Sequence, residues 1–151
     1  MKKRVLVSGI SIFMCFIMMF VFTACANENS SESSDLLENT EKLVVIKASK
    51  TGGSVEDALK AYKEAGELEY EGDTGDYGFY LISVNGYVPD AQKNEFWALY
   101  TTLGEYEGVT YSDTEFGEYE YNDTVCASAS YGISGMPLVE GELYILTVSS
   151  Y

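Results

Sequence analysis

Apolar and polar positions divide this chain into three parts. Residues 5–21 form an uncharged apolar run preceded by basic residues, and residues 26–41 are rich in Ser, Asn and Glu with few apolar positions. From residue 42 onward, short apolar segments alternate with turn residues. The third part therefore has the pattern of a folded domain, whereas the second has too little apolar surface to fold.

The folded part begins with a predicted strand and a predicted helix. Residues 42–49 are largely apolar and β-branched, which favours a strand, and the Lys-Thr-Gly-Gly sequence that follows interrupts it. Ser54 and Asp57 have the spacing of a capping box, and Gly66 stands where a helix would end. The residues that share the apolar face of this helix are Val55, Leu59 and Tyr62.

The rest of the chain has the pattern of strands and turns. Residues 67–78 have the composition of a polar connection, and residues 79–84 are largely apolar on both faces, which predicts an interior strand. Residues 95–103 and 143–148 predict two further strands, with one or two more between them. We therefore expect an α+β domain over residues 42–151 that is β-grasp-like, with one helix packed on a mostly antiparallel sheet of four to six strands.

The N-terminal part has the features of a secretory signal. Three basic residues precede its apolar run. The residues that end this run resemble the lipobox of bacterial lipoproteins, although Phe22 stands where that pattern prefers Leu: Val21, Phe22, Thr23, Ala24 and Cys25. The resemblance implies cleavage after Ala24, a lipid on Cys25 and a domain held at the outer side of the membrane. The alternative is an ordinary secretory signal with an incidental cysteine.

The expected organisation follows from this cleavage. Residues 1–24 are the signal peptide, residues 25–41 a disordered tether, and residues 42–151 the folded domain. The mature chain would keep six lysines and no arginine against 24 acidic residues, a formal charge of −18. Nucleic acid is thereby excluded as a partner, because phosphate recognition requires basic side chains. An anionic lipid surface is disfavoured for the same reason.

The cysteines and the missing histidine restrict the chemistry further. Cys15 leaves with the signal peptide and Cys25 receives the lipid, so Cys126 has no partner for a disulfide and is expected to be buried. With no histidine in the chain, Ser-His-Asp and Cys-His sites and the usual zinc sites are excluded. Asp73 and Asp76 lack the spacing of a calcium loop, which favours a turn there. We expect no enzyme activity, no metal and no cofactor.

The order of the sequence motifs resembles the DUF4430 family, the transcobalamin-like C-terminal domain. A helix start follows the first strand, then come a Val-Asn-Gly hairpin, an aromatic-Trp strand and a last turn with glycine between two acids. In this chain the elements are Ser54 to Leu59, Val84-Asn85-Gly86, Phe96-Trp97 and Glu140-Gly141-Glu142. The resemblance covers residues 43–151. Two departures concern Thr102-Leu103-Gly104, where the family often has a second Asn-Gly, and the last turn, where it usually has two aspartates.

The resemblance implies a binding domain similar to the smaller half of the cobalamin carriers. In those carriers the vitamin lies between this domain and an α-domain that the present chain lacks. The resemblance therefore leaves two alternatives: the ligand is a corrinoid and another envelope protein supplies the second wall, or the domain has a different ligand. Residues 105–131 depart from the family pattern in being longer and richer in tyrosine.

Aromatic residues are the candidate ligand contacts. Residues 105–123 combine seven acids with five aromatics, which suits a planar or cationic ligand, or else an edge strand kept soluble by its charges. Asn85 and Gly86 suit a type I′ turn, and Trp97 suits a core position, so Tyr87 beside the turn is the better contact. The candidate ligand-binding residues are Asn85, Tyr87, Trp97, Tyr100, Tyr119 and Tyr121.

Two hypotheses of function follow from the sequence. The first is a membrane-anchored extracytoplasmic lipoprotein that binds a small ligand, with a corrinoid as the first candidate, for capture or presentation to an uptake system. The alternative is an adhesion or scaffold module that contacts protein or glycan through its tyrosines. A carboxylate-dependent hydrolase is a third and weaker hypothesis, which requires two carboxyl groups facing each other in a cleft.

Overall fold

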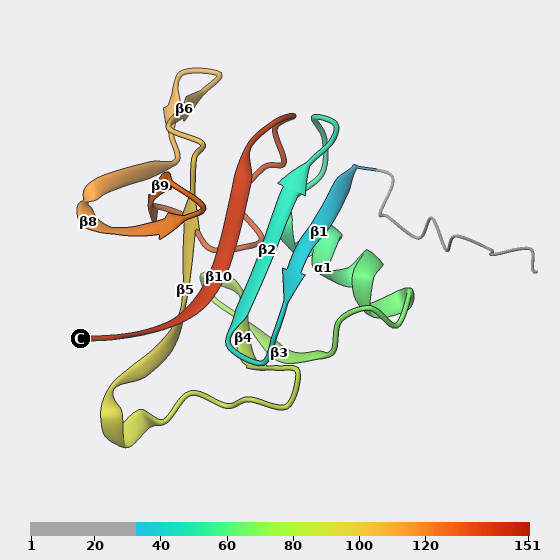
Figure 1. Ribbon diagram of the computed structural model, residues 1–151, viewed down its shortest axis with the longest axis vertical. Helices are drawn as coiled ribbons and strands as arrows, with labels where there is room; N and C mark the ends of the chain where they lie inside the picture. The colour runs from blue at the N-terminus through green and yellow to red at the C-terminus, as the bar shows by residue number, and fades with distance from the viewer. Residues whose placement is uncertain (1–32) are drawn as a thin grey trace, which may run out of the picture.

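The computed structural model describes residues 33–151, which form a six-stranded sheet with one α-helix and two additional hairpins. The order of strands in the sheet is β1-β2-β10-β5-β9-β8, which Figure 1 shows from right to left, and every neighbouring pair is antiparallel. The bounds of these strands are β1 Ser34–Asn39, β2 Leu43–Ala48, β5 Glu95–Thr101, β8 Ser112–Tyr121, β9 Thr124–Ala129 and β10 Leu143–Ser150.

Residues 33–151 contain a single α-helix, α1, which runs over Val55–Glu64 and is capped as predicted. The Ser54 hydroxyl accepts a hydrogen bond from the Asp57 N–H at 3.2 Å, and the Asp57 carboxylate accepts one from the Ser54 N–H at 2.9 Å. The helix ends at Glu64, and Gly66, two residues further on, has a φ of +74° in the left-handed region that glycine tolerates. The capping box and the stop are both local interactions, which is why the sequence predicts them.

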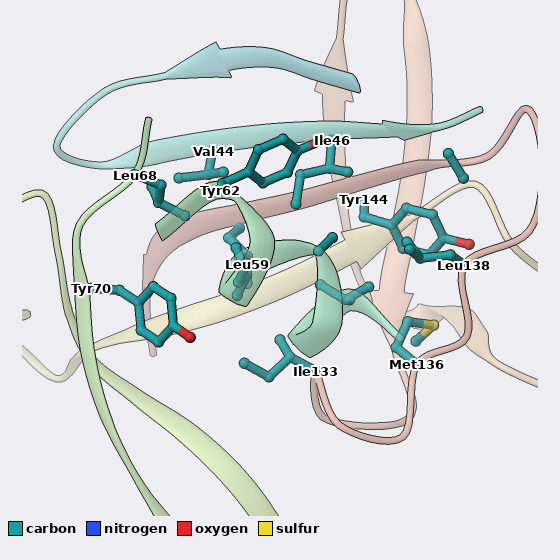
Figure 2. Close-up of a cluster of buried hydrophobic side chains, with 14 of the residues drawn as sticks. Val44, Ile46, Leu59, Tyr62, Leu68, Tyr70, Ile133, Met136, Leu138 and Tyr144 are labelled. Carbon is teal, nitrogen blue, oxygen red and sulfur yellow. The ribbon is translucent and has the colours of Figure 1, made fainter. Parts of the chain in front are cut away.

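The main core lies between α1 and one face of the sheet. Leu59 and Tyr62 of the helix pack against Val44 and Ile46 of β2 and against Tyr144 of β10 (Figure 2). These five side chains are at most 1% exposed. Burying large apolar side chains contributes roughly 1.5–3 kcal/mol each, so this layer accounts for much of the stability of the domain.

A second, smaller cluster occupies the opposite face of the sheet. Val45, Cys126 and Ile145 are fully buried there, and Tyr100 and Tyr119 are among the partly buried side chains packed against them. Cys126 is thus a buried free thiol, as predicted. The sheet is apolar on both faces near its centre, and the helix covers only one of them.

Two hairpins and a short 3₁₀ helix complete the fold. One hairpin pairs β3 with β4, and the other pairs β6 with β7. Their bounds are β3 Tyr70–Gly75, β4 Gly78–Val84, β6 Glu105–Tyr106 and β7 Val109–Thr110, and the 3₁₀ helix η1 spans Ala91–Lys93.

The β3–β4 hairpin corrects two expectations from the sequence. Residues 67–78 were expected to be a polar connection, but β3 lies within them, and residues 79–84 belong to a two-stranded hairpin instead of the interior of the sheet. The polar residues of β3 are mostly solvent-exposed, so their composition concealed a strand. At Gly72 an added Cβ would lie 2.1 Å from the Phe79 ring, so the pairing depends on glycine at this position.

The expected tether over residues 25–41 is wrong for Ser34–Asn39, which form β1 and pair with β2. Backbone pairing stabilises this polar strand, and Ser34 is fully buried with its hydroxyl 2.8 Å from that of Tyr62. The predicted signal peptide of residues 1–24, the predicted lipidation site Cys25 and the first part of the predicted tether lie outside the described residues.

The architecture of the described residues is α+β, sheet-rich with one α-helix, as expected at this level. None of the helices within residues 33–151 is long and apolar enough to span a membrane. The other predicted strands are present as β2, β5, β8, β9 and β10.

Candidate functional site

An aromatic groove opens beside β5, between the β3–β4 hairpin and the chain that leaves β9. Its volume is about 520 Å³. We call this the β5 groove, and the residues that line it are Phe79, Tyr80, Leu81, Phe96, Trp97, Ala98, Leu99, Ser128, Ala129, Ser130, Tyr131, Gly132, Ile133 and Leu146. None of these described lining residues is charged, although the chain has a net charge of −15.

The groove exposes aromatic surface at its rim. Tyr80 is 52% exposed, Phe96 41% and Tyr131 45%. Water contact with large apolar rings is unfavourable, and rings grouped around a concave surface are typical of ligand sites. The β5 groove is therefore the strongest candidate site in the described part of the chain.

Trp97 lines this groove and also packs against the main core. Its ring meets that of Tyr87 edge to face, with centroids 6.4 Å apart and planes at 89°. Its indole Nε1 is buried and has no hydrogen-bond partner among the described residues. The side chain thus links the core to the groove, which agrees with the core position predicted for it.

Tyr87 is held in place by charged neighbours. Its hydroxyl donates a hydrogen bond to the Glu95 carboxylate at 2.5 Å, and the Asp90 N–H donates to the same oxygen at 3.0 Å. These two hydrogen bonds, the tyrosine's first, lower the pKa of Glu95. The Lys42 ammonium lies 4.2 Å from the centre of the Tyr87 ring, a cation–π contact. Tyr87 does not line the β5 groove, and its geometry is that of a support for Trp97.

Asn85 is fixed by hydrogen bonds to other parts of the chain. It has a φ of +47° and Gly86 a φ of +83°, and Val84 and Tyr87 exchange backbone hydrogen bonds across them, so the predicted type I′ turn is present. The Asn85 side-chain amide donates to the Asn39 side chain and to the Thr40 carbonyl, at 2.6 and 2.7 Å. These contacts give Asn85 a structural position.

The three remaining candidates lie on the other face of the sheet. Tyr100, Tyr119 and Tyr121 pack against the second cluster, and the rings of Tyr100 and Tyr119 are 5.7 Å apart. Burial and the neighbouring Glu38 carboxylate raise the pKa of Tyr121. The six candidates therefore fall into two groups, and only Trp97 reaches the β5 groove.

The acidic, tyrosine-rich segment 105–123 does not form one surface. Tyr106 and Tyr111 pack against the main core, Tyr119 and Tyr121 against the second cluster, and Phe116 is 77% exposed. The segment includes β8, which is an edge strand of the sheet. Its charges therefore cover an edge, which is the alternative that the sequence left open.

The sequence reasoning missed Phe79, Tyr80, Phe96 and Tyr131 as groove residues. A signal was available, since residues 77–89, 96–104 and 124–139 contain no charged residue in a strongly acidic chain. Each of these three runs contributes to the groove. In the described residues, no group of three or more His, Cys, Asp or Glu side chains is placed to hold a metal ion.

Comparison with known proteins found no family model that matches this chain and no curated protein similar to it. The resemblance to the DUF4430 family consequently stays a hypothesis from the sequence motifs. The β5 groove is defined by its geometry alone.

Proposed function

We propose that the protein is a non-catalytic binding protein, anchored by a lipid on Cys25 outside the cytoplasmic membrane, that binds a ligand against the aromatic walls of the β5 groove. The observation that carries this proposal is a concave, aromatic and uncharged surface on a chain of net charge −15. Its volume of about 520 Å³ is within the range of small-molecule sites, roughly 300–1,000 Å³.

A corrinoid is the first ligand to test. The motif order that resembles the DUF4430 family supports this choice. The narrower β-grasp-like assignment is also a proposal, and it comes from the order of a strand, one helix and a mostly antiparallel sheet. The groove is open to solvent, which leaves room for an envelope protein to cover a bound ligand. Exposed rings of Tyr80, Phe96 and Tyr131 offer flat contact surface with few rotatable bonds to immobilise.

Ligand binding is tested by titration of the purified full-length protein with cobalamin and cobinamide, followed by the absorbance of the corrinoid and the fluorescence of Trp97. Phe96→Ala is the informative variant, because its ring is on the groove rim and 41% exposed. Phe116→Ala is the matched control, since that ring is 77% exposed on β8 and outside the groove. We expect Phe96→Ala to weaken binding about tenfold and Phe116→Ala to leave it unchanged.

Two outcomes would contradict the ligand proposal. If neither the corrinoid absorbance nor the Trp97 fluorescence changes at high micromolar corrinoid concentration, a corrinoid is not the ligand. Equal weakening by both variants would show that the contact lies outside the β5 groove.

The anchor is tested separately. Cys25→Ser should abolish incorporation of a labelled fatty acid and move the protein from the membrane fraction to the soluble fraction. A protein that stays in the membrane fraction without Cys25 would exclude the lipid anchor.

A further inference from the structure

One edge of β5 is only partly paired. β10 pairs with β5 along its whole length, from Ser150 opposite Glu95 to Tyr144 opposite Thr101. On the other edge β9 pairs with β5 only at Tyr100 and Thr101. Within residues 33–151, no other strand pairs with the remaining part of that edge, residues 95–99.

The register shows which backbone groups face the open edge. The Thr102 N–H donates to the Leu143 carbonyl at 3.2 Å, so the even-numbered residues of β5 bond to β10. Leu99 and Trp97 alternate with these residues and direct their backbone groups away from β10. The Trp97 N–H and carbonyl therefore have no strand partner in the described part of the chain, and unpaired strand edges are templates for another strand.

The open edge coincides with the β5 groove. Four consecutive residues, 96–99, line the groove. Because successive side chains of a strand point to opposite faces, four residues in a row line one groove only when the backbone edge of the strand faces it. The opposite wall includes residues 128–130 at the end of β9. The Ser130 N–H donates to the Tyr111 carbonyl at 2.8 Å, so the chain leaving β9 stays beside the start of β8 and separates from β5.

We propose that the β5 groove binds an extended peptide of a protein partner, which adds to the sheet as a strand beside residues 95–99 of β5. This inference rests on the proposed function, because it takes the same groove as the site and names the class of ligand. A small apolar molecule would cover the aromatic walls and leave the Trp97 backbone unpaired. An extended peptide would cover the aromatic walls and also pair the Trp97 backbone, since its main chain pairs with the edge and its alternate side chains contact the rings.

The chemistry of the surroundings specifies the peptide further. At the start of the strand the Glu95 N–H already donates to the Asp90 carbonyl at 3.1 Å, so the open edge runs from the Glu95 carbonyl to the Leu99 N–H. It spans roughly 14 Å, which sets the paired part of the peptide at about four residues. The groove is uncharged and the chain around it is acidic, so apolar or aromatic side chains at alternate positions and basic residues at the ends fit it best.

The test is selection of a random heptapeptide library against the immobilised full-length protein. A selected peptide is then synthesised in three forms: unmodified, and N-methylated at one or the other set of alternate residues. Because an added strand uses only alternate N–H groups, we expect one methylated form to bind at least about tenfold more weakly and the other to bind like the unmodified peptide. Binding should also slow hydrogen exchange at the Trp97 amide, while Phe96→Ala weakens it and Phe116→Ala does not.

The outcomes separate this inference from the proposed function. Equal binding of both methylated forms would overturn strand addition and leave the groove as an apolar site. Corrinoid binding without any selected peptide would also overturn strand addition, while the proposed function stands. If neither a corrinoid nor any library peptide binds, strand addition and the proposed function are both overturned. A dimer that protects the Trp97 amide at high protein concentration, with no peptide selected, would replace the peptide by a second copy of the chain.

Discussion

Asn85 provides the sharpest test of how this fold is held together, because its side chain joins two loops to the β4 turn. Its amide donates to the Asn39 side chain at 2.6 Å and to the Thr40 carbonyl at 2.7 Å, and its side-chain oxygen accepts from the Glu69 N–H at 3.1 Å. A net hydrogen bond contributes about 0.5–1.5 kcal/mol, and these are partly exposed, so we expect the side chain to contribute about 2 kcal/mol.

Two substitutions separate this side-chain contribution from the backbone contribution. Asn85→Gly removes the three hydrogen bonds but keeps the positive φ of +47° without strain, so it should destabilise the protein by about 2 kcal/mol. Asn85→Ala also places a Cβ in the left-handed region and should cost about 1 kcal/mol more. The expected order of stability is wild type, then the glycine variant, then the alanine variant.

The assay is urea unfolding of the full-length protein, followed by the fluorescence of Trp97. Asn94 is the matched control position, since it has a φ of +56° but only one long side-chain hydrogen bond, 3.4 Å to the Tyr151 carbonyl. Asn94→Gly should therefore change stability by less than about 0.5 kcal/mol. If Asn85→Gly is as stable as the wild type, the loops are not held by this side chain and the reasoning is refuted.

Three further predictions concern buried or capped groups. Burial raises the pKa of Tyr144 to about 12 from its usual 10.0, so its hydroxyl loses its proton at a lower pH in the unfolded chain than in the folded protein. The free energy of unfolding should therefore fall by about 2–3 kcal/mol as the pH rises from 10 through 12. Urea midpoints across that range should show a shallower fall for Tyr144→Phe, and equal slopes would contradict the assignment. Ser54→Ala and Asp57→Ala should each lower the free energy of unfolding by about 1 kcal/mol. The double variant should lose less than the sum of the two, because both side chains belong to one capping box, and additive losses in urea unfolding would argue against this coupling. Burial raises the pKa of the Cys126 thiol, so mass spectrometry should find it alkylated slowly in the native protein and rapidly in urea; equal rates would show that it is accessible.

Short-range features of this protein were predictable from residue patterns. The capping box of Ser54 and Asp57, the helix stop at Gly66 and the type I′ turn at Asn85 each depend on residues within a few positions of one another. Their hydrogen bonds and backbone angles are properties of the local sequence, so no distant partner is needed to recognise them.

Strands with polar composition were not predictable in the same way. β1 and β3 each rely on backbone pairing with a neighbouring strand, and their solvent-facing residues carry no apolar alternation. Pairing of backbone N–H and carbonyl groups is nearly independent of side-chain type, so such strands become evident only when their partner is in place.

The candidate site also combines features that the local sequence predicts with features that depend on distant residues. Composition alone argued against nucleic acid as a partner and showed that the chain has no histidine for histidine-based chemistry, and the pattern around Trp97 predicted a strand with Trp97 in the core. Which aromatic residues share a surface depends on the face of the sheet that each one occupies and on where β9 separates from β5. Tyr100 and Trp97 are three residues apart and lie on opposite faces, whereas Phe79 and Tyr131 are far apart in the chain and line one groove. Which aromatic residues share a surface is decided only by the packing of the sheet, the hairpin and the loop against one another. This packing brings together residues that are far apart in the chain, and local sequence patterns do not relate such residues to one another.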